Sequence, residues 1–189
     1  MPQLAAMIDA SIGGRPAATL TEMDASYRKL KPYKLAAVMV ESRYVASAVN
    51  YLRPLGQEVV TVISYPLGAM STEAKLLQMG QALSDGADEL DIMAFRSSDL
   101  AKVSDELKAV RALAGNHTLK LIYYSDVLAE NDCLRAAELI LDAGITSMAT
   151  NPDYGTVTTP AHVRAIKQRF GSDLRVMASD GVRTHQNSR

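Results

Sequence analysis

The feature that most constrains the fold of this chain is a regular alternation of short apolar stretches with helix-like stretches along nearly its whole length. The apolar, often β-branched stretches predict seven strands, at residues 6–11, 35–40, 58–64, 89–94, 118–124, 147–150 and 174–179. Helical spacing of apolar residues predicts helices between them, at 21–30, 42–52, 72–84, 100–114, 130–143 and 160–170. Because short strand–helix–strand connections join strands that run in one direction, the alternation predicts a parallel sheet.

Two arrangements of a parallel sheet fit this alternation, an open doubly wound sheet and a barrel. Polar residues recur at the carboxyl ends of the predicted strands, and no glycine-rich phosphate turn follows the first strand, which favours the barrel. A closed barrel of this type has eight strands, whereas the pattern stops after seven, and the last residues are too polar for another. We therefore predict an α/β fold, an incomplete TIM-type (β/α) barrel of seven strands. Residues 1–182 are expected to form a single domain and residues 183–189 a polar tail.

Composition excludes several classes of partner. The net charge is -1 and no long basic run occurs, so we expect no nucleic-acid partner. No stretch approaches the ~20 apolar residues of a membrane span, and no signal-peptide pattern opens the chain. Cys133 is the only cysteine and lies in a helical pattern, which predicts a small core residue, a reducing compartment and hence a cytoplasmic location.

Six short motifs follow the predicted elements in order. They are Ile8-Asp9, Tyr65-Pro66-Leu67-Gly68, Thr72-Glu73-Ala74-Lys75, Gly86-Ala87-Asp88-Glu89-Leu90-Asp91, Leu119-Lys120-Leu121-Ile122 and Ala178-Ser179-Asp180-Gly181-Val182-Arg183-Thr184. Taken together they resemble deoxyribose-phosphate aldolase, a family of (β/α)8-barrel lyases that form a Schiff base with the substrate. The resemblance implies retro-aldol cleavage of 2-deoxyribose 5-phosphate to acetaldehyde and glyceraldehyde 3-phosphate.

The resemblance also implies where the catalytic groups belong. In the family a lysine at the end of the sixth strand attacks the sugar aldehyde, and a second lysine on the seventh strand keeps the first one partly unprotonated. In this chain these two positions hold Ala149 and Met177. The family's aspartate on the fourth strand corresponds to Asp91, and Asp9 and Ser11 on the first strand are retained; we treat these three as the candidate catalytic residues.

The expected phosphate site departs from the family pattern as well. Asp153 and Asp180 stand where the family has glycines after the sixth and seventh strands, and a carboxylate repels a phosphate. The remaining candidates for contact with a substrate are Thr150, Ser179, Gly181 and Tyr124.

Two other lysines were considered as replacement nucleophiles. Lys120 lies near the start of the fifth strand, which we expect to be the end opposite the site, and Lys75 lies one turn into a helix. For both, the expected role is that of a surface lysine or of a lysine that packs between helices.

Carboxylates are frequent at the predicted rim. The rim residues are Asp9, Glu41, Asp91, Asp126, Asp153 and Asp180, with Tyr124, Arg96 and Arg183. On the fourth strand Leu90 and Ile92 share one parity, which points Asp91 into the barrel. These carboxylates are compatible with a divalent-metal site, with a pocket for a cationic or neutral ligand, or with ordinary caps of loops and helices. His117, His162 and His185 show no metal-ligand spacing, and we expect no cofactor unless a divalent metal binds the rim.

The sequence therefore predicts an aldolase-like protein in which Schiff-base activity is absent or very weak. The alternatives are a metal-assisted lyase that uses the rim carboxylates, or a non-catalytic binding or assembly subunit. A small phosphorylated sugar or another small ligand is the expected partner. Because an incomplete barrel exposes two strand edges, we also expect a homo-oligomer or association with a homologue.

Overall fold

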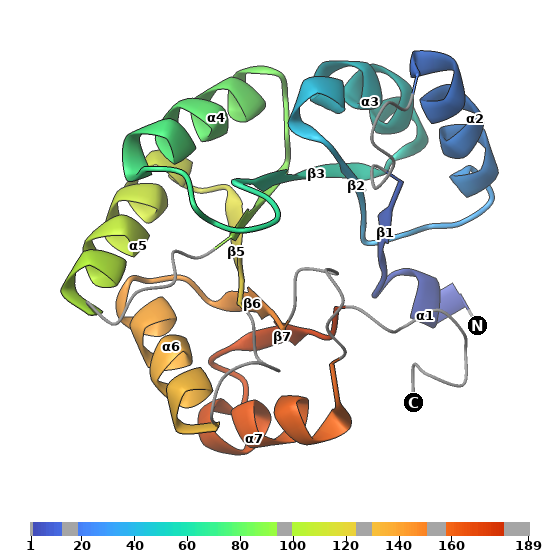
Figure 1. Ribbon diagram of the computed structural model, residues 1–189. Coiled ribbons are helices and arrows are strands. Elements are labelled where there is room, and N and C mark those ends of the chain that lie inside the picture. Colours follow the sequence, from blue (N-terminus) through green and yellow to red (C-terminus); the bar gives the residue numbers. More distant parts are fainter. Residues whose placement is uncertain (1, 13–18, 94–99, 124–129, 151–157, 180–189) are drawn as a thin grey trace. The chain divides into compact units, whose positions relative to one another are not determined.

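The computed structural model describes residues 2–12, 19–93, 100–123, 130–150 and 158–179 (Figure 1). Its strands are β1 (Asp9–Ser11), β2 (Ala37–Val40), β3 (Glu58–Ile63), β4 (Glu89–Met93), β5 (Thr118–Ile122), β6 (Ser147–Ala149) and β7 (Arg175–Met177). Its α-helices are α1 (Pro2–Ala5), α2 (Leu20–Leu30), α3 (Val45–Leu52), α4 (Thr72–Ser84), α5 (Leu100–Ala114), α6 (Glu130–Asp142) and α7 (Pro160–Phe170). Two 3-10 helices, η1 (Ser42–Tyr44) and η2 (Arg53–Leu55), flank α3.

The strands occur in the sheet in the same order as in the chain, from β1 to β7. β1, β2 and β3 pair in parallel, as do β5, β6 and β7. This order and direction are those of successive strand–helix–strand units. The predicted α/β fold with seven strands is therefore confirmed.

Differences from the predicted elements are small and local. β1 is shorter than predicted, because α1 and a turn occupy the residues before Asp9; Met7 N–H donates to the Leu4 carbonyl. The predicted helix at 42–52 is divided into η1 and α3. At the start of α4, the Ser71 hydroxyl accepts a hydrogen bond from Ala74 N–H. Within the described ranges, no helix combines the length and the apolar character that crossing a bilayer requires.

The chain packs as two compact units, and each is described by itself. The first contains Met1–Ile63 and Leu77–Leu90, and the second contains Ser64–Leu76 and Asp91–Arg189. The boundary therefore passes through α4 and β4, and Asp91 is the first residue of β4 that belongs to the second unit. The expectation of a single domain over residues 1–182 stays a prediction.

The core of the first unit lies between β2, β3 and the helices α2 and α3. Val38, Val59 and Val60 are fully buried, and Tyr27 of α2 is buried with its ring 5.4 Å from that of Tyr51. The helix α2 begins with a complete capping box, in which Thr19 and Glu22 satisfy each other's backbone N–H groups. Because β2 and β3 are buried on both faces, their sequences are nearly continuous runs of apolar residues.

In the second unit, α5, α6 and α7 lie along one face of β5, β6 and β7 (Figure 1). The apolar residues buried in this unit include Val110 of α5, Ile140 of α6 and Ile166 of α7, together with Leu121 of β5 and Met148 of β6. With this face closed by helices, the opposite face of the same strands is the one available for polar chemistry.

Candidate active site

The ends of β6 and β7 carry the two positions where the family resemblance implies lysines. Ala149 and Met177 are register partners on these neighbouring strands, and Ala149 also pairs with Ile122 of β5. Register partners on parallel strands point to the same face of the sheet. The two positions are therefore side by side, as the proposed roles of the two lysines require, but neither residue carries an amine, and Ala149 is completely buried.

The position of Ala149 follows from the way α6 ends. Gly144 has a left-handed φ of 76°, which closes the helix, and Ile145 N–H then donates to the Ile140 carbonyl. The chain reverses in this tight turn and enters β6 at Ser147. A side chain at Gly144 would strain the turn, because L-residues other than glycine rarely adopt this φ.

Asp91 of β4 forms an ion pair with Lys120 of β5. The Lys120 Nζ lies 3.3 Å from the Asp91 Oδ1, and both side chains are more than nine-tenths buried. A buried carboxylate is tolerated when a cation compensates it, since the loss of hydration otherwise opposes burial. The pair explains why a strand surrounded by apolar residues can hold an aspartate.

The expectation that Lys120 is a surface lysine or packs between helices is wrong, since it is buried on β5; its expected position at the end opposite the site stays a prediction. Lys120 is the middle residue of β5, and its ammonium reaches the aspartate that the family resemblance assigns to catalysis. It precedes Ile122 by two residues, so it faces the same side of the sheet as Ile122 and its register partner Ala149. The offset along the strand is about 7 Å. Lys120, Ala149 and Met177 thus share one face.

Lys75 has a different environment. It is fully buried on α4, and its Nζ lies 2.6 Å from the Glu106 Oε1 of α5 and donates to the Met93 carbonyl at 3.1 Å. The Thr72 hydroxyl donates to the other oxygen of Glu106 at 3.0 Å. Of the two expected roles, packing between helices is confirmed and a surface position is wrong.

Two of the predicted substrate-contact residues meet at the ends of β6 and β7. Thr150 N–H donates to the Met177 carbonyl at 3.1 Å, and Ser179 N–H donates to the Thr150 hydroxyl at 3.2 Å. Thr158, just before α7, contacts the Thr150 hydroxyl and donates to the Ser179 carbonyl. Gly181 and Tyr124, the other two, lie outside the described residues, and a substrate role for all four stays a prediction.

Three further residues of the predicted site and rim, namely Asp9, Ser11 and Glu41, belong to the first unit. Asp9 is partly buried on β1, where it pairs with Ala37, and Ser11 is exposed beside Met39. Glu41, after β2, accepts hydrogen bonds from Arg43, the shorter of them 2.8 Å. The catalytic roles of Asp9 and Ser11 stay predictions.

No group of three histidine, cysteine, aspartate or glutamate side chains suited to a metal ion occurs among the residues that the structure describes. His117 is exposed, and His162 lies in the first turn of α7, where its N–H donates to Thr159. Most of the rim residues lie outside the described ranges, namely Asp126, Asp153, Asp180, Tyr124, Arg96 and Arg183, and so does His185. The metal hypothesis therefore stays a prediction.

Sequence reasoning missed the partnership of Lys120 with Asp91, although the signal was present. In Thr118-Leu119-Lys120-Leu121-Ile122 the lysine is flanked by two leucines of the opposite parity. The same parity argument that points Asp91 into the barrel points Lys120 there too.

These features define a class, the (β/α)-barrel proteins of the aldolase type, with charged side chains on the inner strand face. No model of a known protein family matches the chain. A deoxyribose-phosphate aldolase of Staphylococcus carnosus is 32% identical over 174 residues, which are 89% of this chain and 79% of the relative. One of Streptococcus suis is 30% identical over 179 residues, 92% of this chain and 81% of the relative.

The solved structures agree. The aldolase QR15 superposes with a TM-score of 0.92 at 28% identity, covering 100% of this chain and 86% of that one. A tetrameric deoxyribose phosphate aldolase from Aeropyrum pernix shares the fold with a TM-score of 0.92 at 23% identity, covering 99% of this chain and 81% of that one. The chain belongs to the deoxyribose-phosphate aldolase family.

Proposed function

We propose that this protein is a deoxyribose-phosphate aldolase-like protein of the cytoplasm whose Schiff-base activity is absent or very weak. The observation that carries the proposal is the pairing of Ala149 with Met177. Two cooperating lysines would have to lie on neighbouring strands at this spacing, and the side chains of both register partners lack a nitrogen, which supports the proposal.

The chemistry of the family's reaction explains the expected loss. Cleavage of the carbon–carbon bond needs an iminium as electron sink, and the iminium needs an amine bonded to the substrate carbon. The methyl group of Ala149 cannot form that bond. Met177 in turn supplies no positive charge to free a neighbouring amine. Asp91 is retained, but a proton relay alone does not provide the electron sink.

The proposed ligand is a small phosphorylated sugar, in keeping with the substrate named for the relatives. We also propose self-association or association with a homologue. The tetrameric state of the Aeropyrum pernix protein supports an oligomer. Among the strands that the structure describes, β7 stands at one end of the sheet order and its Val176 and Met177 are only partly buried, which also supports an oligomer.

The test is turnover of 2-deoxyribose 5-phosphate by the purified full chain, measured as released acetaldehyde beside the Staphylococcus carnosus relative. We expect no turnover, or a rate at least about a thousandfold lower, since removal of a catalytic nucleophile typically has an effect of this size. A rate comparable with that of the relative would refute the proposal. Activity that a chelator abolishes would instead favour the metal-assisted lyase.

A matched gain-of-function variant sharpens the test. The double substitution Ala149→Lys with Met177→Lys places both amines at the register pair, and we expect it to raise turnover above that of the unmodified chain. The single substitution Met177→Lys is the control, because it adds a charge without the nucleophile.

A further inference from the structure

We infer that the exposed face formed by α3 and by residues 77–84 of α4 is the surface on which a second copy of this chain docks, with Leu77 of each copy packed against Gly80 of the other. The inference rests on the self-association proposed above and deepens it by naming the contact surface. This α3–α4 face lies on the first unit, whereas the strand edge at β7 belongs to the second.

The two helices of the α3–α4 face are neighbours within the first unit. The Nε2 of Gln78 on α4 donates to the Ser42 hydroxyl, which precedes α3, at 2.8 Å. Just after α4, a Cβ atom at Gly86 would lie 3.4 Å from the side chain of Val49 on α3. The exposed sides of the two helices therefore adjoin. A shallow groove borders them and is lined by Val49, Asn50, Arg53 and Pro54.

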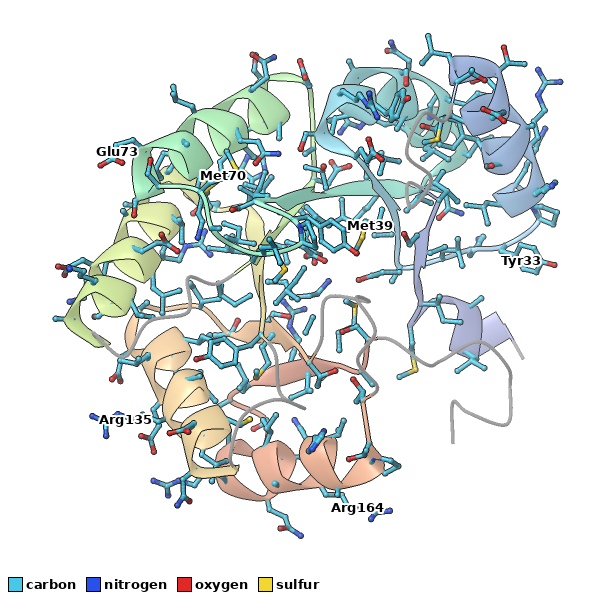
Figure 2. All side chains as sticks on the ribbon, viewed as in Figure 1. Tyr33, Met39, Met70, Glu73, Arg135 and Arg164 are labelled. Carbon is cyan, nitrogen blue, oxygen red and sulfur yellow. The ribbon has the colours of Figure 1, made fainter. Side chains whose placement is uncertain are left out.

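The sequence of the α3–α4 face is free of charged residues. Neither α3 nor residues 77–84 contain an aspartate, glutamate, lysine or arginine. In contrast, each of α2, α5, α6 and α7 exposes three or more charged side chains, and Figure 2 shows Arg135 and Arg164 projecting from α6 and α7. At the border of the face, Arg53 is paired with Asp88 at 2.8 Å. Depletion of charge at the centre, with charged residues at the rim, is typical of a protein–protein interface.

Leu77 and Gly80 stand one turn apart on the same side of α4. Leu77 is 77% exposed, the most exposed of the large apolar residues on the described helices. Gly80 is a helix-interior glycine, and glycine weakens a helix relative to alanine. The fold itself does not require it, because a Cβ atom at Gly80 would have no other described element within 4 Å. Close approach of another molecule explains both residues, since the leucine supplies apolar surface and the glycine leaves room for it.

The spacing of these two residues points to a second copy as the occupant. Leu77 and Gly80 are equally far from the midpoint between Gln78 and Met79, on opposite sides of it. When α4 of a second copy crosses at this midpoint in the antiparallel direction, each Leu77 faces the other copy's Gly80, and the contact is made twice. One face thus carries both halves of the contact, as a closed two-fold interface requires.

The size of a stable interface explains the part of α3. Such an interface buries about 800 Å² and roughly 20–30 residues on each partner. Residues 77–84 of one helix are too few to supply this, so the exposed side of α3 and the groove at its end complete the surface. The apolar side chains of Val49 and Pro54 in that groove suit contact with a partner.

The experiment is sedimentation equilibrium of the purified full chain over a range of concentrations, which gives the dissociation constant for self-association. Leu77→Lys places a charge at the centre of the α3–α4 face, and we expect it to raise that constant at least about tenfold. Leu113→Lys is the matched control, because it makes the same change at an exposed leucine of α5, outside the face. We expect the control to leave the constant unchanged.

Gly80→Leu separates the contact from folding. Leucine favours the helix more than glycine does, and a Cβ atom at Gly80 has open space in the single chain, so circular dichroism should show no loss of helix. The new side chain occupies the room that Leu77 of the second copy needs, and we expect the dissociation constant to rise at least about tenfold. A constant that neither Leu77→Lys nor Gly80→Leu changes overturns the inference, and so does an equal rise in the Leu113→Lys control.

These outcomes are distinguishable from failure of the proposed function. A chain that stays monomeric over the whole concentration range refutes the proposed self-association and this face together. Self-association that survives both Leu77→Lys and Gly80→Leu refutes only the face. Turnover of 2-deoxyribose 5-phosphate tests the catalytic part of the proposed function separately, and its result does not bear on where the copies meet.

Discussion

Two lysine–carboxylate pairs are buried in the second unit, and they differ in where the protein places them. Lys75 and Glu106 join the helices α4 and α5 at 2.6 Å, and a threonine hydroxyl and a backbone carbonyl complete the network. Lys120 and Asp91 join the strands β5 and β4 at 3.3 Å, on the face that also carries Ala149. The Lys75–Glu106 pair thus links two helices, whereas the Lys120–Asp91 pair lies on the strand face of the candidate site.

Burial alone does not show which role a lysine–carboxylate pair has. Both lysines are almost inaccessible, so exposure does not distinguish the pair between helices from the pair on the strand face. The secondary structure that carries each pair does separate them. Lys75 lies on a helix and bridges α5 and the end of β4, whereas Lys120 lies on the strand face that also carries Ala149.

The largest expected effect is on stability, from the substitution Lys75→Met. It keeps the length of the side chain but leaves Glu106 buried without its cation, and we expect a loss of about 3–5 kcal/mol in the free energy of unfolding. Urea denaturation measures it. The double substitution Lys75→Met with Glu106→Leu is the control, and it should recover much of the loss. If Lys75→Met leaves the free energy of unfolding unchanged, the Lys75–Glu106 pair does not stabilise the fold more than the Lys120–Asp91 pair.

Asp91→Asn is expected to have a smaller effect on stability. The amide keeps the shape of the side chain and some capacity for hydrogen bonds, so we expect a loss of about 1–3 kcal/mol. The same denaturation series measures it, with Lys120→Met completing a double-mutant cycle. A loss of stability larger than that of Lys75→Met would mean that the strand pair, Lys120 with Asp91, stabilises the fold more than the helix pair does.

Thr72→Val should cost about 1.5 kcal/mol, because it removes a hydrogen bond to a charged, buried carboxylate while keeping the β-branched shape. Thr72→Ser, which retains the hydroxyl group, is the matched control and should be closer to the unmodified chain. Equal stability of the Val and Ser variants would show that Glu106 does not depend on Thr72.

The smallest expected effect is on pH dependence at the start of α4. Glu73 projects from the outer side of this helix (Figure 2). Its own backbone N–H and then the Ser71 hydroxyl donate to its carboxylate, which lowers its pKa from 4.5. A lowered pKa in the folded state contributes stability above pH 4.5, and that contribution is lost as the pH falls through the folded value.

Thermal unfolding from about pH 6 to pH 3 measures this contribution, and Glu73→Gln should have a slightly flatter profile over that range. Ser71→Ala is the companion variant, since it removes one of the two donors. If Glu73→Gln leaves the pH profile of thermal unfolding unchanged, the carboxylate at the start of α4 does not contribute to the pH dependence of stability.

Much of the fold could be predicted from the sequence, because each element carries its own periodicity. The helix at 160–170 is predicted to the residue, since Thr159 and Pro160 suit its first turn. Most strands are predicted one to three residues too long at one or both ends, because the sequence pattern does not mark where the regular pairing of a strand begins or stops. α1 was missed, since its four residues are too few to show a period.

The sequence by itself determined the alternation of strands and helices, the family, and the lack of an amine at positions 149 and 177. These are local properties, read from residue identity and spacing. Only the tertiary structure decided that Ala149 lies beside Met177, that Lys75 fastens two helices, and that Lys120 reaches Asp91. Those facts depend on strand register and on which side chains face each other across neighbouring elements. Such contacts join residues that are far apart in the chain, and no local pattern specifies them.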